Sequence, residues 1–531
     1  MTAAISTRPA ADLVVTGGSV IDGSGGPGLP LDVVVREGRV LDLVPHATTY
    51  DRTGTAVVDA TGLVVAPGFI DLHSHADFSL PVEVSAESAL AQGVTTLVAG
   101  NCGFSPFPYR GGPVLQRATS TFGPHLTWAW HDAASYAELL REAQPGVNIA
   151  LQVGHAALRL AALGSGDRRP PTQAEQQTME KMLDEAADQG VSGFSTGLIY
   201  APGSFAEPAE VEGLARRAAR HGLLYSTHLR NESGDLVAAV EEALTTARRA
   251  SVRLEISHLK AMGPANHGRV DDAMVLIEQA RNEGVDVACD VYPYTASSTM
   301  LSSRLPDWAM DGGPSRLLER LGDPDTRARA RVDLAARFGT DVDPAGVILV
   351  EGEENTAGAS LVDLGERWGV DPAEAALRAL ERAGGLVVIV NHAMAEADVE
   401  SVLRYAHTSV ASDGLFMTVA GNGRPHPRSF GTFARVLGRY VRDRGVLTLP
   451  EAIRKMTSLP ASRLGVTDRG VLKPGAVADV VVFDPARVSD LATYVEPRQL
   501  ALGVEHVLLS GRRAVRDGEV AAERNGAVLT G

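Results

Sequence analysis

The chain has 531 residues, of which 21% are charged and 44% are hydrophobic, and its formal net charge at pH 7 is −16. This length predicts about two to four domains, or one large barrel with attachments. The hydrophobic fraction excludes a wholly disordered chain. No uninterrupted run of about 18 apolar residues is present, so we expect no membrane-spanning helix. The acidic balance, without a basic run, argues against nucleic acid and anionic membranes as partners.

The cysteine content indicates the cellular compartment. Cys102 and Cys289 are the only cysteines, which excludes a disulfide framework. Residues 1–12 also lack the charged and then apolar pattern of a secretory signal. We therefore expect a cytoplasmic protein.

Both ends of the chain contain short β-branched runs between glycine-rich turns. These runs are residues 13–15, 19–21, 32–35, 480–483 and 504–509. Neither end is long enough to bury a good core alone. We therefore predict one small β-sandwich domain formed from both termini, residues 1–66 and 466–531, with the middle of the chain inserted in it.

The middle of the chain alternates between strand and helix patterns. Eight apolar runs have the length of a strand: residues 69–72, 94–99, 147–153, 191–195, 223–227, 252–257, 285–291 and 408–411. Helical patterns lie between most of them, and those over residues 207–221 and 235–250 have one apolar face. We predict an α/β fold, a (β/α)8 TIM-type barrel over residues 67–465. Such a barrel places its chemistry where its strands end.

One segment interrupts the alternation. More than 100 residues separate the seventh run from the eighth, and residues 302–344 are rich in Arg, Asp and Pro. We predict a small insertion over about residues 297–345, beside the barrel mouth, with a lid as one role for it.

Histidines follow three of the predicted strands. His73 and His75 end the first strand, and residues at i and i+2 of a strand point to the same side. His228 and His258 each stand where a later apolar run turns polar. A single histidine of this kind is more often structural. Four at one barrel mouth indicate a metal site, because imidazole nitrogens are preferred zinc ligands.

Two further candidates end the second and eighth strands. Cys102 lies between glycines, and a thiolate ligand favours zinc over magnesium. The alternative is a buried inert cysteine, which is what we expect of Cys289. Asp413 precedes Gly414, so a simple turn is the alternative for it. Beside a metal, its carboxylate can take a proton from water and later give it to a leaving amine.

This combination resembles the amidohydrolase superfamily, over nearly the whole chain. Five strings narrow the resemblance to its D-aminoacylase (N-acyl-D-amino-acid deacylase) branch: Gly100-Asn101-Cys102-Gly103-Phe104-Ser105, Gly197-Leu198-Ile199-Tyr200-Ala201-Pro202-Gly203, Ile256-Ser257-His258-Leu259-Lys260, Asp290-Val291-Tyr292-Pro293-Tyr294 and His426-Pro427-Arg428-Ser429-Phe430-Gly431-Thr432-Phe433. Many superfamily members bridge two metals with a lysine that ends strand four. Here that strand ends at Gly197 without a lysine, and the branch uses a cysteine after strand two instead.

The resemblance implies a reaction and a cofactor. The chain is expected to hydrolyse the amide bond of N-acyl-D-amino acids to a carboxylate and a free D-amino acid. Zinc would lower the pKa of bound water to about 7, and Asp413 would be the general base and then the general acid. The resemblance also implies that Cys102, His228 and His258 hold a tight zinc ion. His73 and His75 would serve a second, weaker site, whose occupancy the sequence leaves open.

The same resemblance implies which residues bind the substrate. Arg428 and Lys260 would hold its carboxylate, since arginine bonds both carboxylate oxygens with a planar fork. Tyr200, Tyr292 and Ser298 would assist. The alternatives are a surface arginine and tyrosines packed in the core. An acidic substrate side chain would need one more cation, for which Arg110 and Arg304 are candidates.

Other functions remain open at this stage. One is a cyclic amide hydrolase related to dihydroorotases and hydantoinases, whose usual bridging lysine is absent here. Another is a sugar N-deacetylase, for which we find no sugar or phosphate clamp. A third is a non-catalytic scaffold that keeps the barrel, although such relatives tend to lose the metal ligands. The sequence does not determine the oligomeric state or distinguish D from L substrates.

Overall fold

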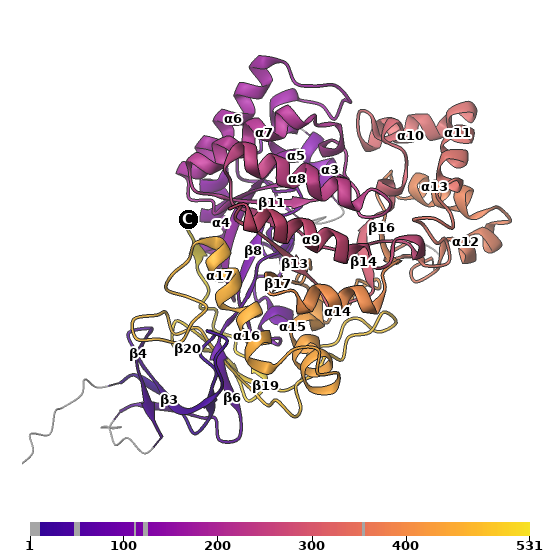
Figure 1. The fold of residues 1–531 in the computed structure, drawn as a ribbon. Helices are drawn as coiled ribbons and strands as arrows, with labels where there is room; N and C mark the ends of the chain where they lie inside the picture. Colours follow the sequence, from indigo (N-terminus) through magenta and orange to yellow (C-terminus); the bar gives the residue numbers. More distant parts are fainter. Residues whose placement is uncertain (1–10, 47–53, 111–112, 121–125, 353–355) are drawn as a thin grey trace, which may run out of the picture.

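The computed structural model describes residues 11–46, 54–110, 113–120, 126–352 and 356–531. It contains a central barrel, a β-domain and a lobe. Figure 1 shows the β-domain at the lower left of the barrel and the lobe at its right. No helix in the described part of the chain is both long and apolar enough to cross a membrane.

Eight parallel strands form the barrel, and their order around it follows the chain. They are β7 (Phe69–Asp71), β8 (Val94–Ala99), β9 (Asn148–Gly154), β10 (Gly193–Gly197), β11 (Leu224–His228), β12 (Leu254–Ile256), β13 (Val287–Val291) and β17 (Thr408–Val410). All their residues are buried, as expected for parallel strands covered on both faces. The predicted barrel is therefore confirmed, with strand ends that differ by at most two residues from the apolar runs.

Strands β7 and β17 meet just beyond their ends and close the barrel. Ser74 and Gly414 form an isolated parallel bridge. The Asp413 N–H donates to the carbonyl of His73 at 2.8 Å, and the His75 N–H donates to the carbonyl of Gly414 at 2.9 Å. This seam places the two predicted ligands on the first strand beside Asp413.

Helices surround the barrel strands. The longer ones are α4 (Ala133–Ala143), α5 (His155–Leu163), α6 (Gln173–Asp188), α7 (Pro208–Arg220), α8 (Leu236–Ala250), α9 (Arg269–Asn282), α14 (Glu396–Arg404), α15 (Arg428–Arg435) and α16 (Leu449–Met456). The shorter ones are α1 (Ala76–Ser79), α2 (Glu87–Leu90), α3 (Pro113–Thr119) and α17 (Ser458–Leu464), and a π-helical segment, η5 (Val436–Asp443), follows α15. Both predicted helices, α7 and α8, are present, and α8 buries its apolar face against the barrel.

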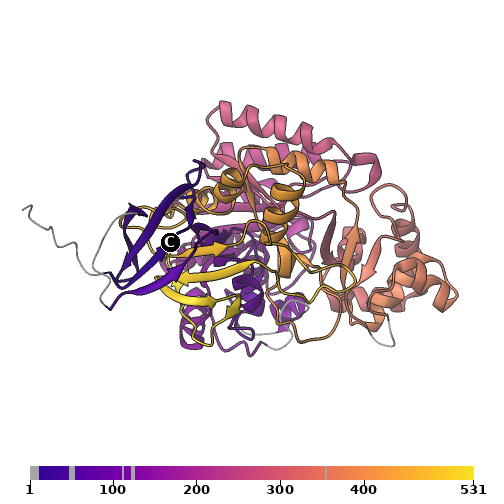
Figure 2. The same ribbon diagram turned by 90° about the horizontal axis from the view of Figure 1, so that it is seen from below.

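The β-domain contains strands from both ends of the chain, as predicted. They are β1 (Leu13–Thr16), β2 (Ser19–Val20), β3 (Leu29–Arg36), β4 (Arg39–Pro45), β5 (Ala56–Asp59), β6 (Val64–Pro67), β18 (Val480–Phe483), β19 (Val504–Leu509), β20 (Arg512–Arg516) and β21 (Glu519–Val520). The two halves are joined where β6 pairs with β2 on one side and with β18 on the other. Figure 2 shows the N-terminal and C-terminal strands lying together.

The last residues of the chain do not stay in the β-domain. Strand β22 (Val528–Leu529) pairs in parallel with β9 of the barrel, and the N–H of Gly531 donates to the carbonyl of Gly190 at 3.0 Å. The segment that we assigned to the β-domain up to residue 531 therefore returns to the barrel. Its apolar pattern is too short to show which sheet it joins.

The lobe is larger than the predicted insertion over residues 297–345. Its sheet contains β14 (Ala296–Met300), β15 (Val347–Leu349) and β16 (Val388–His392), and its helices are α10 (Pro314–Gly322), α11 (Pro324–Ala335), α12 (Leu361–Trp368) and α13 (Pro372–Arg382). These helices bury a hydrophobic core of their own. The lobe is longer than predicted because its antiparallel sheet is completed by β16, which lies far along the chain from β14.

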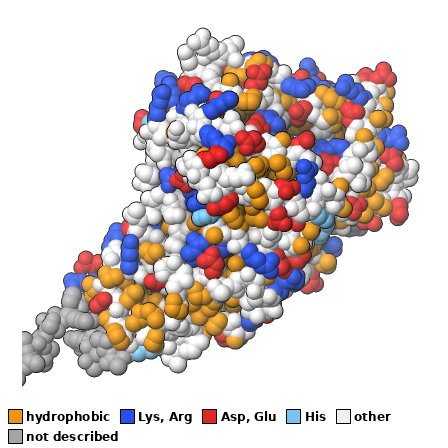
Figure 3. Space-filling model, viewed as in Figure 1, with side chains coloured by type: hydrophobic (Ala, Val, Ile, Leu, Met, Phe, Trp, Pro, Cys, Tyr) orange, Lys and Arg blue, Asp and Glu red, His pale blue; other side chains and the backbone are white. Residues whose placement is uncertain are grey.

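The surface has a mixed charge distribution. In Figure 3 acidic and basic side chains alternate over the barrel and the lobe, whereas hydrophobic side chains gather over the β-domain. Leu29 and Val57 of the β-domain are 51% and 41% exposed.

Asp479 joins the β-domain to the barrel. Its buried carboxylate accepts the Ser510 N–H at 2.8 Å and the Asn148 side-chain N–H at 3.1 Å, and it pairs with Arg469. We expect Asp479→Ala to lower the free energy of unfolding by about 1–3 kcal/mol, because it leaves the partly buried Arg469 and the N–H groups of Ser510 and Asn148 without their acceptor. Thermal and denaturant unfolding would measure the loss. The exposed Glu523 provides a control, and an equal loss in Glu523→Ala would contradict this role.

Candidate metal centre

The predicted ligands lie at the carboxyl ends of five barrel strands. His73 and His75 follow β7, Cys102 follows β8, His228 ends β11, His258 follows β12 and Asp413 follows β17. All six are at least 90% buried. Because parallel strands end at the same edge of a barrel, ligands that are far apart in the sequence meet there.

The ligand atoms form two groups that share Cys102. One group contains Cys102, His228 and His258, and the other contains Cys102, His73, His75 and Asp413. Within each group the ligand atoms lie within 4.8 Å of one another. The sulfur of Cys102 is 3.6 Å from Nδ1 of His228, 3.6 Å from Nε2 of His258 and 3.3 Å from Nε2 of His73.

Three of these residues have a left-handed backbone conformation. The φ angles of Cys102, His258 and Asp413 are 55°, 35° and 51°. This conformation costs about 1–3 kcal/mol for a residue other than glycine, and it persists where the surroundings enforce it, often at functional sites. Gly100 also has a positive φ, 90°, and a Cβ there would be 2.1 Å from the carbonyl oxygen of Gln152. Both facts require glycine at this position.

Burial sets the charge of the ligands. It lowers the pKa of His73 to about 3 and that of His228 to about 4, so both rings are neutral at pH 7. Burial also raises the pKa of the Cys102 thiol well above its usual range. Burial would raise the pKa of Asp413 too, but the positive charge of Arg428 opposes it and holds this pKa well below the ordinary value. Asp413 is therefore ionised and able to accept a proton.

The donor set fits a zinc ion. Neutral imidazoles are the form that binds metals, and a metal ion deprotonates a coordinating thiol even where burial opposes its ionisation. Nitrogen and sulfur ligands together with a carboxylate are typical of zinc and unsuited to magnesium or calcium.

Two buried carboxylates that the sequence analysis did not single out contact the histidines from outside. Asp290 lies 3.3 Å from Nδ1 of His73 and accepts the backbone N–H of His258 at 2.8 Å. Glu232 lies 3.3 Å from Nε2 of His228 and 3.1 Å from Nδ1 of His258. The sequence offered one signal for each residue. Asp290 lies near the end of a predicted strand, and Glu232 follows His228 by four residues.

The residues predicted to bind the substrate carboxylate lie next to the ligands. Nη1 of Arg428 is 2.7 Å from Oδ2 of Asp413, and its Nη2 donates to the carbonyl of Ser298 at 3.2 Å. The guanidinium carbon is 4.9 Å from the centre of the Tyr292 ring, and the Tyr292 hydroxyl is buried with no hydrogen-bond partner among the described residues. Arg428 is therefore a buried residue of the site and not a surface arginine.

Tyr200 and Lys260 lie on either side of this group. The Tyr200 ring centre is 4.8 Å from that of His228, and its hydroxyl is 2.9 Å from Oγ1 of Thr299. The Lys260 ammonium is 2.5 Å from Glu232 and 5.6 Å from the centre of the Tyr292 ring. The structure thus brings every predicted site residue together, with the charge of Lys260 already paired.

One cavity opens beside the ligands, and a second cavity adjoins it. The first, of about 500 Å³, is lined by His75, Cys102, Asp413, Arg428 and Ser298 among others. The second has a volume of about 600 Å³. The two share Tyr200, Met300 and Leu386 as a common wall.

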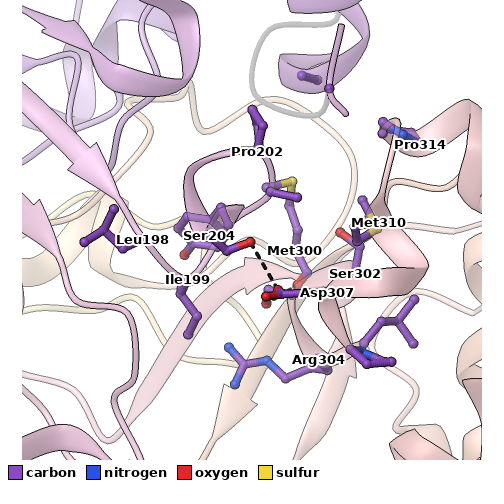
Figure 4. A pocket seen from close by; sticks show the side chains of 18 of the residues that line it. Leu198, Ile199, Pro202, Ser204, Met300, Ser302, Arg304, Asp307, Met310 and Pro314 are labelled. Atoms are coloured by element: carbon purple, nitrogen blue, oxygen red, sulfur yellow. Dashed lines mark hydrogen bonds between the residues drawn. The ribbon is translucent and has the colours of Figure 1, made fainter. Parts of the chain in front are cut away.

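Arg304 lies in the second cavity (Figure 4). Its side chain is 2% exposed, and its Nε and Nη1 atoms have no hydrogen-bond partner among the described residues. Ser204 and Asp307, which hydrogen bond to each other at 3.1 Å, line the same cavity. Arg110, the other candidate cation, is exposed and lines neither cavity.

Comparison with known proteins identifies relatives over almost the whole chain. The model of the amidohydrolase family matches residues 56–515. N-acyl-D-glutamate deacylase of Alcaligenes xylosoxydans xylosoxydans is 41% identical over 94% of this chain and 93% of its own length. D-aminoacylase of the same organism is 35% identical over 98% of this chain and 97% of its own length.

A solved structure is similar to this chain in both sequence and fold. It is N-acyl-D-glutamate deacylase from Bordetella bronchiseptica, complexed with zinc and with a phosphonate inhibitor that mimics the tetrahedral intermediate of its reaction. It is 37% identical, has a TM-score of 0.84, and the similarity covers 98% of this chain and 100% of that one. The chain therefore belongs to the amidohydrolase family, in the branch of the D-aminoacylases and N-acyl-D-amino-acid deacylases.

Proposed function

We propose that this protein is a zinc-dependent hydrolase that cleaves the amide bond of N-acyl-D-amino acids to a carboxylate and a free D-amino acid. One observation is decisive for this proposal. Cys102, His228 and His258 form a buried group of ligands that suits zinc. This group lies beside the ionised Asp413 and the buried Arg428. A metal site, a proton acceptor and a carboxylate-binding cation are the three parts that this reaction requires. The relatives of this chain with the same named activity support the proposal.

Cys102, His228 and His258 would hold a zinc ion, which would supply a nucleophile at neutral pH by lowering the pKa of coordinated water to about 7. Asp413 lies 3.2 Å from Nε2 of His75 and 3.4 Å from Nε2 of His73, so its carboxylate faces the ligands. It accepts a proton from the attacking water and then donates that proton to the leaving nitrogen. Arg428, 2.7 Å away, keeps Asp413 ionised between turnovers.

Arg428 also binds the α-carboxylate of the substrate. One of its nitrogens faces Asp413 and another faces the Ser298 carbonyl, and the fork of its N–H groups suits a carboxylate. The hydroxyl of Tyr292, which has no hydrogen-bond partner among the described residues, assists it, and Lys260 adds positive charge behind that ring. Tyr200, beside His228, stabilises the negative oxygen that forms at the scissile carbonyl.

Arg304 selects an acidic substrate side chain. A buried guanidinium with unpartnered nitrogens is costly unless an anion pairs with it, and the second cavity is accessible beside the site. With the α-carboxylate at Arg428 and the amide at the metal, the side chain enters this cavity. Binding at three points fixes the hand of the substrate. We therefore propose N-acyl-D-glutamate or N-acyl-D-aspartate as the substrate class.

A cyclic amide hydrolase is the second candidate. Strand β10 ends at Gly197 without the metal-bridging lysine typical of that group, so this activity is less well supported. The substrate in either case is a small molecule. We propose a cytoplasmic location because both Cys102 and Cys289 are unpaired thiols.

Replacing the proton acceptor tests the reaction. We expect Asp413→Asn to lower kcat about 10²–10⁴-fold, the typical contribution of general acid–base catalysis, and to keep the tight zinc ion. Amine release from N-acetyl-D-glutamate and elemental analysis of the same preparation would measure the two effects. Near-normal turnover by the zinc-loaded variant would remove Asp413 from the mechanism.

Replacing Arg304 tests the side-chain specificity. We expect Arg304→Leu to lower kcat/KM for N-acetyl-D-glutamate about 100-fold or more, because a buried charge pair is lost, and to leave N-acetyl-D-leucine hydrolysis intact or raised. Arg117, an exposed arginine of the same cavity, provides the matched control, and Arg117→Leu should change neither value more than a few-fold. Equal losses on both substrates in Arg304→Leu would refute the assignment.

A further inference from the structure

Glu232 contacts both histidines of the tight metal site and a lysine. Its carboxylate is 3.3 Å from Nε2 of His228, 3.1 Å from Nδ1 of His258 and 2.5 Å from the ammonium of Lys260. The residue is 3% exposed. Its backbone carbonyl accepts the N–H of Met262 at 2.7 Å. This bond ties the loop after β11 to the loop after β12, so the carboxylate and the two histidines are held together.

The opposite nitrogen of each ring faces Cys102. Nδ1 of His228 and Nε2 of His258 are each 3.6 Å from its sulfur, on the side where a metal would be held. A neutral imidazole carries its N–H proton on one of its two nitrogens, and a metal must bind the nitrogen without that proton. In the metal-binding tautomer of both rings, the proton therefore lies on the nitrogen that faces Glu232. A carboxylate there can accept both hydrogen bonds.

Lys260 favours the opposite tautomer of His258. Its ammonium is 2.7 Å from Nδ1 of that ring, and an ammonium group only donates hydrogen bonds. Donation to Nδ1 would leave the ring proton on Nε2, the nitrogen that faces Cys102, and would block metal binding there. Glu232 competes with this arrangement because it accepts from both Lys260 and Nδ1 of His258.

We propose that Glu232 is a positioning residue that selects, in His228 and His258 together, the tautomer that binds the metal, against the hydrogen bond that Lys260 offers to His258. This inference rests on the zinc site of the proposed function. It gives Glu232 a role that is distinct from a salt bridge with Lys260, since that salt bridge involves only one of its three contacts.

The test compares two variants that break the same ion pair. Zinc affinity of the full chain is measured by competition with a chromophoric chelator. We expect Glu232→Gln to weaken zinc binding about 10–100-fold, because an amide cannot accept on both sides. Lys260→Met should stay within about threefold of the original protein, since its loss removes only the competing donor. Cys102→Ala marks the loss of a ligand, and Cys289→Ala, which removes the other buried cysteine, serves as the control.

A spectroscopic readout separates positioning from general damage. In the cobalt-substituted protein the thiolate-to-metal charge-transfer band reports the ligand sphere, and we expect Glu232→Gln to shift or weaken it while Lys260→Met preserves it. Thermal unfolding without metal should be similar in the two variants. If Glu232→Gln does not fold, Glu232→Asp replaces it, with weakened zinc binding expected because the shorter side chain cannot reach both rings.

Two results would overturn the proposal. One is zinc affinity equal to that of the original protein in Glu232→Gln or in its substitute Glu232→Asp. The other is an equal loss in Lys260→Met, which would assign the effect to the ion pair. Both results are comparisons of zinc affinity and do not depend on enzyme activity. If the original protein hydrolysed no N-acyl-D-amino acid, the proposed function would be overturned, but the role proposed for Glu232 would still be tested.

Discussion

The barrel closes between β7 and β17, and this closure holds His73 and His75 beside Asp413. Asp71, at the end of β7, accepts the backbone N–H of Ser412 at 2.9 Å and also its hydroxyl. Burial raises the pKa of Asp71 to about 7, although these hydrogen bonds oppose that rise. The strands meet here through a side chain and a few backbone bonds beyond their ends. This contact places the first pair of histidines against Asp413, more than 300 residues later in the chain.

The same edge of the barrel contains an unusual density of buried charge. Three carboxyl groups surround the histidines: those of Glu232, Asp290 and Asp413. The positive charges of Lys260 and Arg428 partly offset their negative charge. Buried ion pairs contribute little to stability because desolvation offsets their attraction. Their concentration at a barrel mouth therefore indicates function. Each of these charges faces a candidate metal ligand or a charge of opposite sign.

Much of the fold follows from local sequence patterns. Each barrel strand is an apolar run with a polar residue at its end, and the predicted ligands His73, His228 and His258 stand at such ends. The insertion beside the barrel mouth was predicted, but the full extent of the lobe and the pairing of β22 were not, because they depend on strands distant in the sequence. Glu232 and Asp290 were missed for the same reason: their roles arise from which rings they face. The resemblance assigned Lys260 to the substrate carboxylate, whereas the structure also pairs it with Glu232.

We propose that this site hydrolyses N-acyl-D-amino acids with acidic side chains. The most direct measurement is amine release by the zinc-loaded protein from matched N-acetyl-D-glutamate and N-acetyl-L-glutamate. If Arg428, Arg304 and the metal bind three points of the substrate as proposed, release is rapid from the D enantiomer alone. Equal release from both enantiomers, or release from neither, would contradict this proposal.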